Sequence, residues 1–120
     1  PDLQSFNLVL HTSKTDPFGK GVTLTIFENN VLYPVCTMYR YLNVRRAQGA
    51  CASSPLFIND DVDYAPLLRN TFLKYLKDTL ARLGYVNNEY KGHSFRIGAA
   101  SSAASAGVED HVIQILGRWS

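Results

Sequence analysis

The sequence predicts a mixed fold, mainly α-helical with a small antiparallel β-hairpin. Two short runs near the start alternate apolar and polar residues, and later segments repeat apolar residues every three or four positions. The chain has 120 residues, of which 46% are hydrophobic, so it is long enough to bury a core of its own. We therefore expect one domain spanning residues 1–120.

The hairpin is predicted from residues 6–11 and 22–27, which alternate as half-buried strands do. The connection between them contains Asp16-Pro17 and two glycines, which are typical of turns. Lys14 and Lys20 lie on this long tip. Taken by themselves, two such lysines are solvated residues that keep a strand edge soluble.

A first helix is expected from Pro34, because proline suits the first helical turn, to the stop at Gly49. Its predicted core stripe is Val35, Met38, Tyr39 and Leu42. Arg45 and Arg46 complement the negative end of the helix dipole, with phosphate contact as the alternative.

Four more segments complete the predicted fold. We expect a short buried strand at residues 56–58 and a long helix opening near Pro66 and closing before Gly84. A helix rich in alanine and serine should end at Gly107, and a short helix should follow it. The residues expected to face inward are Leu68, Phe72, Leu76, Leu80 and Leu83 on the long helix, and Val112, Ile113, Ile115 and Leu116 on the last one.

Composition excludes several classes of protein. A net charge of +2 and a pI near 8.7 permit nucleic-acid binding without arguing for it. Cys36 and Cys51 lack the close spacing of zinc ligands, and we expect a reducing, intracellular compartment and no metal or other cofactor. Residues 59–63 are acidic but lack the glycine and glutamate of a calcium loop, so we expect an acidic turn. No apolar run reaches the length of a membrane span, and no signal peptide opens the chain.

His93 and Arg96 are the first candidate site residues. Residues three apart share one face of a helix. An imidazole can exchange a proton near neutral pH, and a guanidinium matches two oxygens of one phosphate. The alternative is that His93 and Ser94 close the helix start, with Ser94 as its cap, while Arg96 points to solvent. Ile97 occupies the position where a capping box needs an acidic residue.

Three motifs follow one another along the chain. They are Ser13-Lys14-Thr15 on the hairpin tip, His93-Ser94-Phe95-Arg96 before the small-residue helix, and Leu116-Gly117-Arg118-Trp119-Ser120 at the end. In this order they resemble the catalytic domain of tyrosine recombinases, the phage-integrase-like enzymes of DNA strand exchange. The residues of these motifs are most similar to those of recombinases of eukaryotic mobile elements and genes derived from them. The resemblance covers nearly the whole chain and implies that family's catalytic-domain fold, truncated at both ends.

The resemblance implies DNA strand cleavage and rejoining, in site-specific recombination or mobile-element integration, through a covalent 3′-phosphotyrosyl intermediate. Lys14 would protonate the departing 5′-oxygen, His93 would assist proton transfer, and Arg96 would hold the non-bridging oxygens. The family's histidine-or-tryptophan position falls on Arg118 by spacing and on Trp119 by side-chain chemistry. Neither the family's first arginine nor its nucleophilic tyrosine has a counterpart here, so we expect the chain alone to be inactive in cleavage.

The resemblance also implies partners and a location. Double-stranded DNA is the expected partner, with a homo-oligomer, a tetramer on DNA, in the full-length parent and no membrane association. We expect a nuclear location if the parent is eukaryotic and a cytoplasmic one otherwise. Two other hypotheses stay open: a domesticated, catalytically inactive DNA-binding module of the same fold, and a plain α+β interaction domain.

Overall fold

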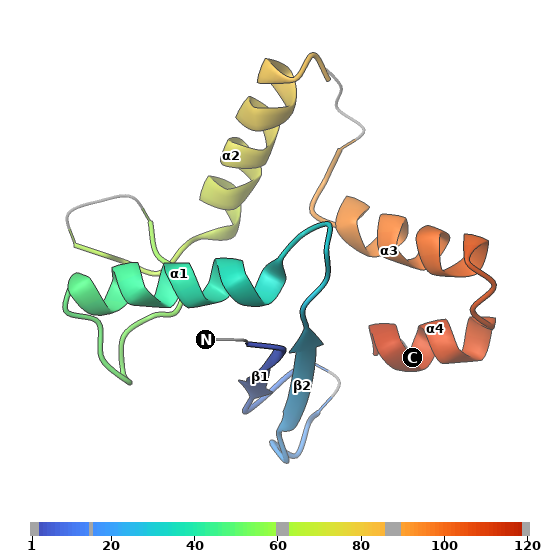
Figure 1. Cartoon of the computed structure of the whole chain (residues 1–120), viewed down its shortest axis with the longest axis horizontal. Coiled ribbons are helices and arrows are strands. Elements are labelled where there is room, and N and C mark those ends of the chain that lie inside the picture. Colours follow the sequence, from blue (N-terminus) through green and yellow to red (C-terminus); the bar gives the residue numbers. More distant parts are fainter. Residues whose placement is uncertain (1–2, 15, 60–62, 86–89, 119–120) are drawn as a thin grey trace. The chain divides into compact units, whose positions relative to one another are not determined.

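A computed structural model describes residues 3–14, 16–59, 63–85 and 90–118 (Figure 1). In this part of the chain the order of elements is β1 (Ser5–Leu10), β2 (Val22–Phe27), α1 (Pro34–Ala47), α2 (Arg69–Arg82), α3 (Ser94–Ser105) and α4 (Asp110–Gly117). The described residues thus form four helices and one two-stranded antiparallel sheet, which confirms the predicted mixed fold. Contacts within the chain define two compact units, Pro1–Ser54 and Pro55–Ser120, and each is described by itself.

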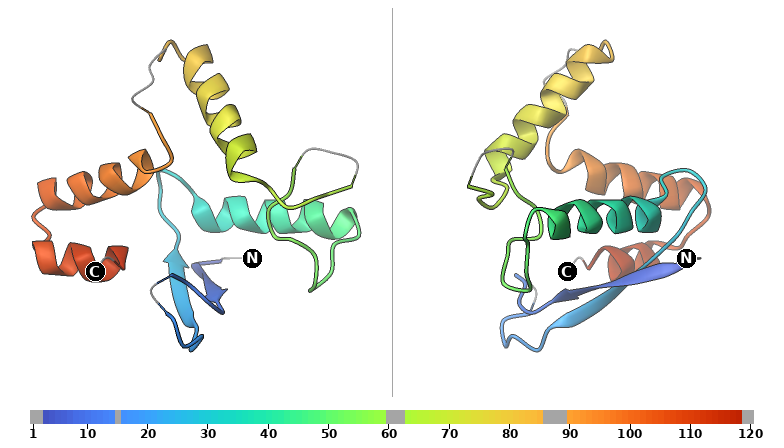
Figure 2. Two further views of the ribbon diagram at one scale, coloured as in Figure 1. Left: turned by 180° about the vertical axis from the view of Figure 1, so that it is seen from behind. Right: turned by 60° about the vertical axis from the view of Figure 1, so that its left-hand side comes forward.

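The β-hairpin of the first unit agrees with the sequence prediction. β1 pairs antiparallel with β2 (Figure 2). Their register sets Leu8 opposite Leu24 and Phe6 opposite Ile26. These four apolar side chains are half-buried, and the residues between them are exposed, as a period of two requires. The alternation read from the sequence therefore corresponds to a real inner and outer face.

Helix α1 packs against β2, and its buried stripe is narrower than predicted. Val35 is 2% exposed, and Met38 and Leu42 are half-buried, but Tyr39 is 41% exposed and does not belong to the core. Arg45 is only 5% exposed, and its Nη1 donates a hydrogen bond to Gln48 Oε1 at 3.1 Å. The alternative of a phosphate contact is therefore wrong for Arg45, because its side chain is covered by the fold.

The segment before α2 departs from the prediction. Residues 56–58 do not form a buried strand: Leu56 and Phe57 are exposed, and Ile58 makes an isolated antiparallel bridge with Pro66. Since Pro66 is engaged in this bridge, α2 starts at Arg69. Of the predicted acidic turn, residues 60–62 lie outside the described residues.

The apolar faces in the second unit are only partly covered. Leu76 and Leu80 on α2 and Val112 and Ile113 on α4 are half-buried. The prediction of an inward side chain is wrong for the five other positions, which are Leu68, Phe72, Leu83, Ile115 and Leu116. Apolar periodicity marks a face that can be buried, whereas burial itself requires a neighbouring element on that face.

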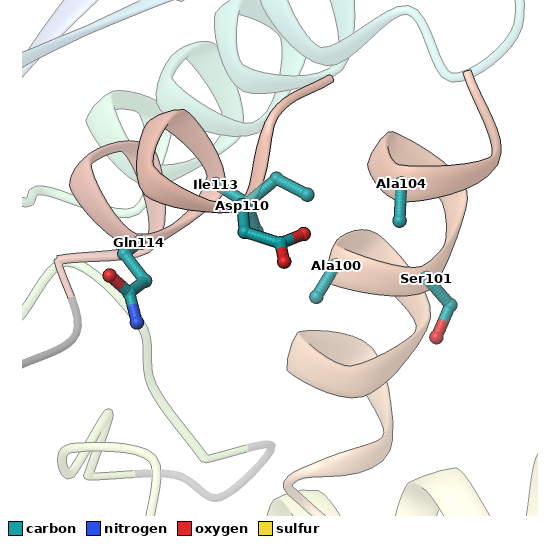
Figure 3. Close-up of a pocket in the computed structure, with 6 residues that line it drawn as sticks. All are labelled: Ala100, Ser101, Ala104, Asp110, Ile113 and Gln114. Atoms are coloured by element: carbon teal, nitrogen blue, oxygen red, sulfur yellow. The ribbon is translucent and has the colours of Figure 1, made fainter. Parts of the chain in front are cut away.

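The small residues of α3 let α4 lie against it, as the alanine and serine content predicts. Ala100 and Ala104 on α3 face Asp110 and Ile113 on α4 across a shallow pocket (Figure 3). Gly107, with φ of +86°, makes the turn between the two helices in a backbone conformation that residues with a Cβ rarely adopt. No helix among the described residues combines the length and the apolar character needed to cross a membrane.

Candidate functional site

The exposed start of α3 carries His93 and Arg96 together. His93 is the N-cap residue, but its backbone is already helical (φ −75°, ψ −11°), and its carbonyl accepts the Ile97 N–H at 3.0 Å. The helical repeat therefore runs from His93 through Arg96, and both side chains are exposed. The structure thus brings these two predicted site residues onto one turn of one helix.

Ser94 does not cap this helix. Its hydroxyl accepts the Lys91 backbone N–H at 2.8 Å, and its own N–H donates to the Lys91 carbonyl at 2.9 Å. The prediction of Ser94 as the cap is therefore wrong, but the rest of that alternative agrees with the structure: Ser94 closes the turn before α3, His93 is the N-cap residue, and Arg96 is exposed. The first turn of α3 also contains no acidic residue. Its backbone amides accordingly favour an anion from outside the helix.

Sequence reasoning missed Arg69, which the tertiary structure places beside this turn. A Cβ added to Gly92 would lie 3.8 Å from Arg69 Nη2 and 3.7 Å from Leu73 Cδ2. Three residues after Arg69 and Gly92, Phe72 on α2 and Phe95 on α3 are also close together. The centroids of their rings lie 6.2 Å apart, and the ring planes make an angle of 47°. The first turn of α2 therefore packs against the segment that leads into α3.

We call Arg69, Lys91, His93 and Arg96 the α3 cationic cluster. Arg69, Lys91 and Arg96 are positively charged, and His93 adds an imidazole that can donate a hydrogen bond. The sequence near Arg69 offers one sign of a functional role, which is that a basic residue occupies the first turn of a helix. The positive end of the helix dipole disfavours a positive charge there. Such a cluster suits a phosphate diester, since guanidinium groups donate paired hydrogen bonds to its oxygens.

The Leu116-Gly117-Arg118 motif reaches the same region of the second unit. A hollow between α3 and α4 is lined by Phe95, Arg96, Ala99, Ala100, Ala103, Ile113, Leu116 and Gly117. The residue just before Arg118 thus lines the hollow that Arg96 also lines. Arg118 itself is half-buried and ends α4 in a left-handed conformation (φ 57°), with its N–H bonded to the Ile115 carbonyl at 3.1 Å.

Trp119, the other candidate for the family's histidine-or-tryptophan position, lies outside the described residues. The choice between Arg118 and Trp119 therefore stays as the sequence left it.

Lys14 is exposed on the hairpin tip and belongs to the first unit. Its convergence with His93 and Arg96 on one phosphate stays a prediction.

Acidic and thiol groups do not gather into a metal site in the described part of the chain. His111 is exposed, and its Nδ1 lies 3.3 Å from Glu109 Oε2. Cys36 and Cys51 are both free thiols.

We predict that Cys51 is alkylated at unusually low pH. Hydrogen bonds from the side chains of Ser53 (3.1 Å) and Ser54 (3.5 Å) lower the pKa of this exposed thiol from 9.0 to about 7. Its thiolate fraction near pH 8 should be about tenfold that of an unperturbed thiol. Iodoacetamide labelling followed by peptide mass spectrometry should give a midpoint near pH 7.

The control for this prediction is Ser53→Ala, which removes the largest cause of the shift and should move the midpoint toward 9. Cys36, in the same chain, is an internal reference for the reagent. An unchanged midpoint in Ser53→Ala would show that the serine hydroxyl does not stabilise the thiolate.

The fold and the site together define a mixed α/β chain with an exposed cationic helix start. In comparisons with protein-family models, curated proteins and solved structures, nothing matches this chain.

Proposed function

We propose that this chain is part of a tyrosine-recombinase catalytic domain that cleaves and rejoins DNA strands. The observation that carries the proposal is the exposed first turn of α3, where His93 and Arg96 share one face. Arg69 lies beside Gly92 at the entry to this turn, and Gly117 of the closing motif lines the same hollow as Arg96.

Each residue has a defined part in the proposed reaction. A tyrosine of the parent protein attacks the phosphorus, a 3′-phosphotyrosyl bond forms, and the bond to the 5′-oxygen breaks. Arg96 stabilises the charge that develops on the non-bridging oxygens, and His93 assists proton transfer. Lys14 gives the departing 5′-oxygen its proton, and either Arg118 or Trp119 donates a further hydrogen bond to the phosphate.

Arg69 and Lys91 extend this proposal from the reacting phosphate to its neighbours. Phosphate contacts position a protein on duplex DNA without reading its sequence. Arg69, which lies beside Gly92, and Lys91, in the turn before α3, suit the next phosphates of the same strand. A tetramer on DNA, and a nuclear location in a eukaryotic parent, belong to the same proposal.

The test is duplex binding measured by fluorescence anisotropy as salt is raised. Neutralising three or four phosphates releases counterions, so the logarithm of the affinity should fall against the logarithm of salt with a slope of about −3. A chain that shows no affinity for duplex DNA at low salt would contradict the proposal and favour a plain interaction domain. DNA binding by a parent protein that does not cleave DNA would favour the inactive DNA-binding module.

A double-mutant cycle of Lys14→Ala and Arg96→Ala tests whether the two residues act on one phosphate. Residues that share a partner are coupled by at least ~0.5 kcal/mol, whereas independent contacts simply add. Coupling in duplex binding supports a shared phosphate. Additive losses would show that Lys14 and Arg96 contact different parts of the DNA.

A further inference from the structure

One carboxylate holds the tip of the hairpin. Asp16 Oδ2 accepts the Gly21 N–H at 2.7 Å, and Oδ1 accepts the Lys20 N–H at 3.1 Å. The Asp16 backbone also participates, since its N–H donates to the Ser13 carbonyl at 3.0 Å and its carbonyl accepts the Gly19 N–H at 3.2 Å. Asp16 therefore connects the turn that begins at Ser13 to the residues that lead into β2.

The loop that Asp16 holds ends at Gly21, which lies close to the end of β1. Gly21 has φ of +77°, and a Cβ built on it would lie 3.2 Å from the Leu10 carbonyl oxygen. The Leu10 carbonyl is part of the backbone and cannot move aside as a flexible side chain can. The loop therefore has little conformational freedom where it rejoins the sheet. Asp16 bonds to the residue at that point, so the Ser13 turn is anchored to the end of the sheet.

Lys14 follows Ser13 in this turn and is exposed. A lysine side chain has many rotamers, and a mobile backbone would add to the freedom that it loses on reaching a fixed target. Holding the backbone in place before binding reduces that loss. The hydrogen bonds around Asp16 perform this task for Ser13, the residue before Lys14, and for Asp16 itself.

We propose that Asp16 is a positioning residue that directs Lys14 toward DNA. The inference rests on the proposed function, because it assumes that Lys14 approaches the DNA backbone. Asp16 does not contact DNA itself, because its carboxylate oxygens accept hydrogen bonds from the backbone amides of Lys20 and Gly21. It acts on Lys14 by holding the loop in place.

The experiment captures lysines of the intact chain on DNA. The probe is a set of duplexes, each with one abasic site whose aldehyde stands at a different position. A lysine Nζ adds to the aldehyde carbon, water leaves, and the imine is reduced by added cyanoborohydride to a stable secondary amine. Peptide mass spectrometry then gives the ratio of capture at Lys14 to capture at Lys91, which is exposed, belongs to the second unit and serves as the internal reference.

The test variant is Asp16→Asn, in which an amide NH₂ replaces one of the two accepting oxygens. Its matched control is Asp78→Asn, an exposed residue of α2 whose substitution changes the net charge equally. Asp16→Glu, which keeps the carboxylate on a longer side chain, is the second variant. Amide hydrogen exchange at Lys20 and Gly21 reports whether the loop has opened.

We expect Asp16→Asn to lower the Lys14-to-Lys91 capture ratio about tenfold, the effect of losing one hydrogen bond to a charged group. Asp78→Asn should leave the ratio unchanged, and Asp16→Glu should give an intermediate ratio. An unchanged ratio in Asp16→Asn would overturn the positioning role alone. A wild-type chain that binds the duplexes without capture at either lysine would overturn the proposed DNA contact of Lys14, and the inference with it.

Discussion

Replacing Arg96 with alanine is expected to weaken duplex DNA binding by about ten- to a hundredfold, the range for hydrogen bonds to a charged partner. The guanidinium is exposed on the first turn of α3, where no acidic residue offsets the helix dipole. Its loss should also reduce the magnitude of the salt slope by about one, because one fewer phosphate is neutralised. Preference among DNA sequences should not change, since phosphate contacts carry no base information.

Arg69→Ala should have a smaller effect in the same direction, because Arg69 lies beside Gly92 and not on α3 itself. The matched control is Arg82→Ala, which removes an exposed arginine from the opposite end of α2. Anisotropy titrations of the three variants across a range of salt give the comparison. Equal losses in all three would mean that net charge, and not the α3 cationic cluster, determines affinity.

Replacing Glu28 with alanine is expected to destabilise the first unit by about 1–3 kcal/mol, the range for losing a helix cap and charge-assisted hydrogen bonds. Glu28 Oε1 accepts the Asn29 N–H at 3.1 Å and the Val35 N–H at 3.2 Å, and Oε2 accepts the Cys36 N–H at 3.0 Å. The N-cap residue Tyr33 offers no side-chain hydrogen bond of its own. Glu28 therefore satisfies the start of α1 from the end of β2.

Urea unfolding followed by far-UV circular dichroism measures this effect, and amide exchange at Val35 and Cys36 localises it. Glu28→Gln keeps the shape and one acceptor oxygen, so it should lose only part of the stability. Glu109→Ala is the control in the other unit, where the carboxylate lies on the surface beside His111. Unchanged exchange at Val35 and Cys36 in Glu28→Ala would show that this carboxylate does not stabilise α1.

Elements defined by local patterns were predicted well. The expected strands at 6–11 and 22–27 correspond to β1 and β2, and the helix expected from Pro34 is α1. Alternation and helical spacing arise from backbone geometry within a few residues, so a short segment carries the whole signal. The start of α2 was missed because the Ile58–Pro66 bridge is a contact between separate segments.

Predictions of burial were less accurate than predictions of elements. Ile115 and Leu116 are 70% and 72% exposed although their spacing suggests an inner face, and Arg45 is buried although its charge suggests solvent. Burial depends on which element covers a side chain, and that is decided by packing between distant parts of the chain.

The same division applies to the candidate site. The sequence alone determined that His93 and Arg96 lie on one face of a helix, because residues three apart on a helix share a face. Only the tertiary structure placed Arg69 beside Gly92 and lined one hollow with both Arg96 and Gly117. The physical reason is range: backbone hydrogen bonding is set by neighbouring residues, whereas these contacts form where the folded chain brings distant residues together.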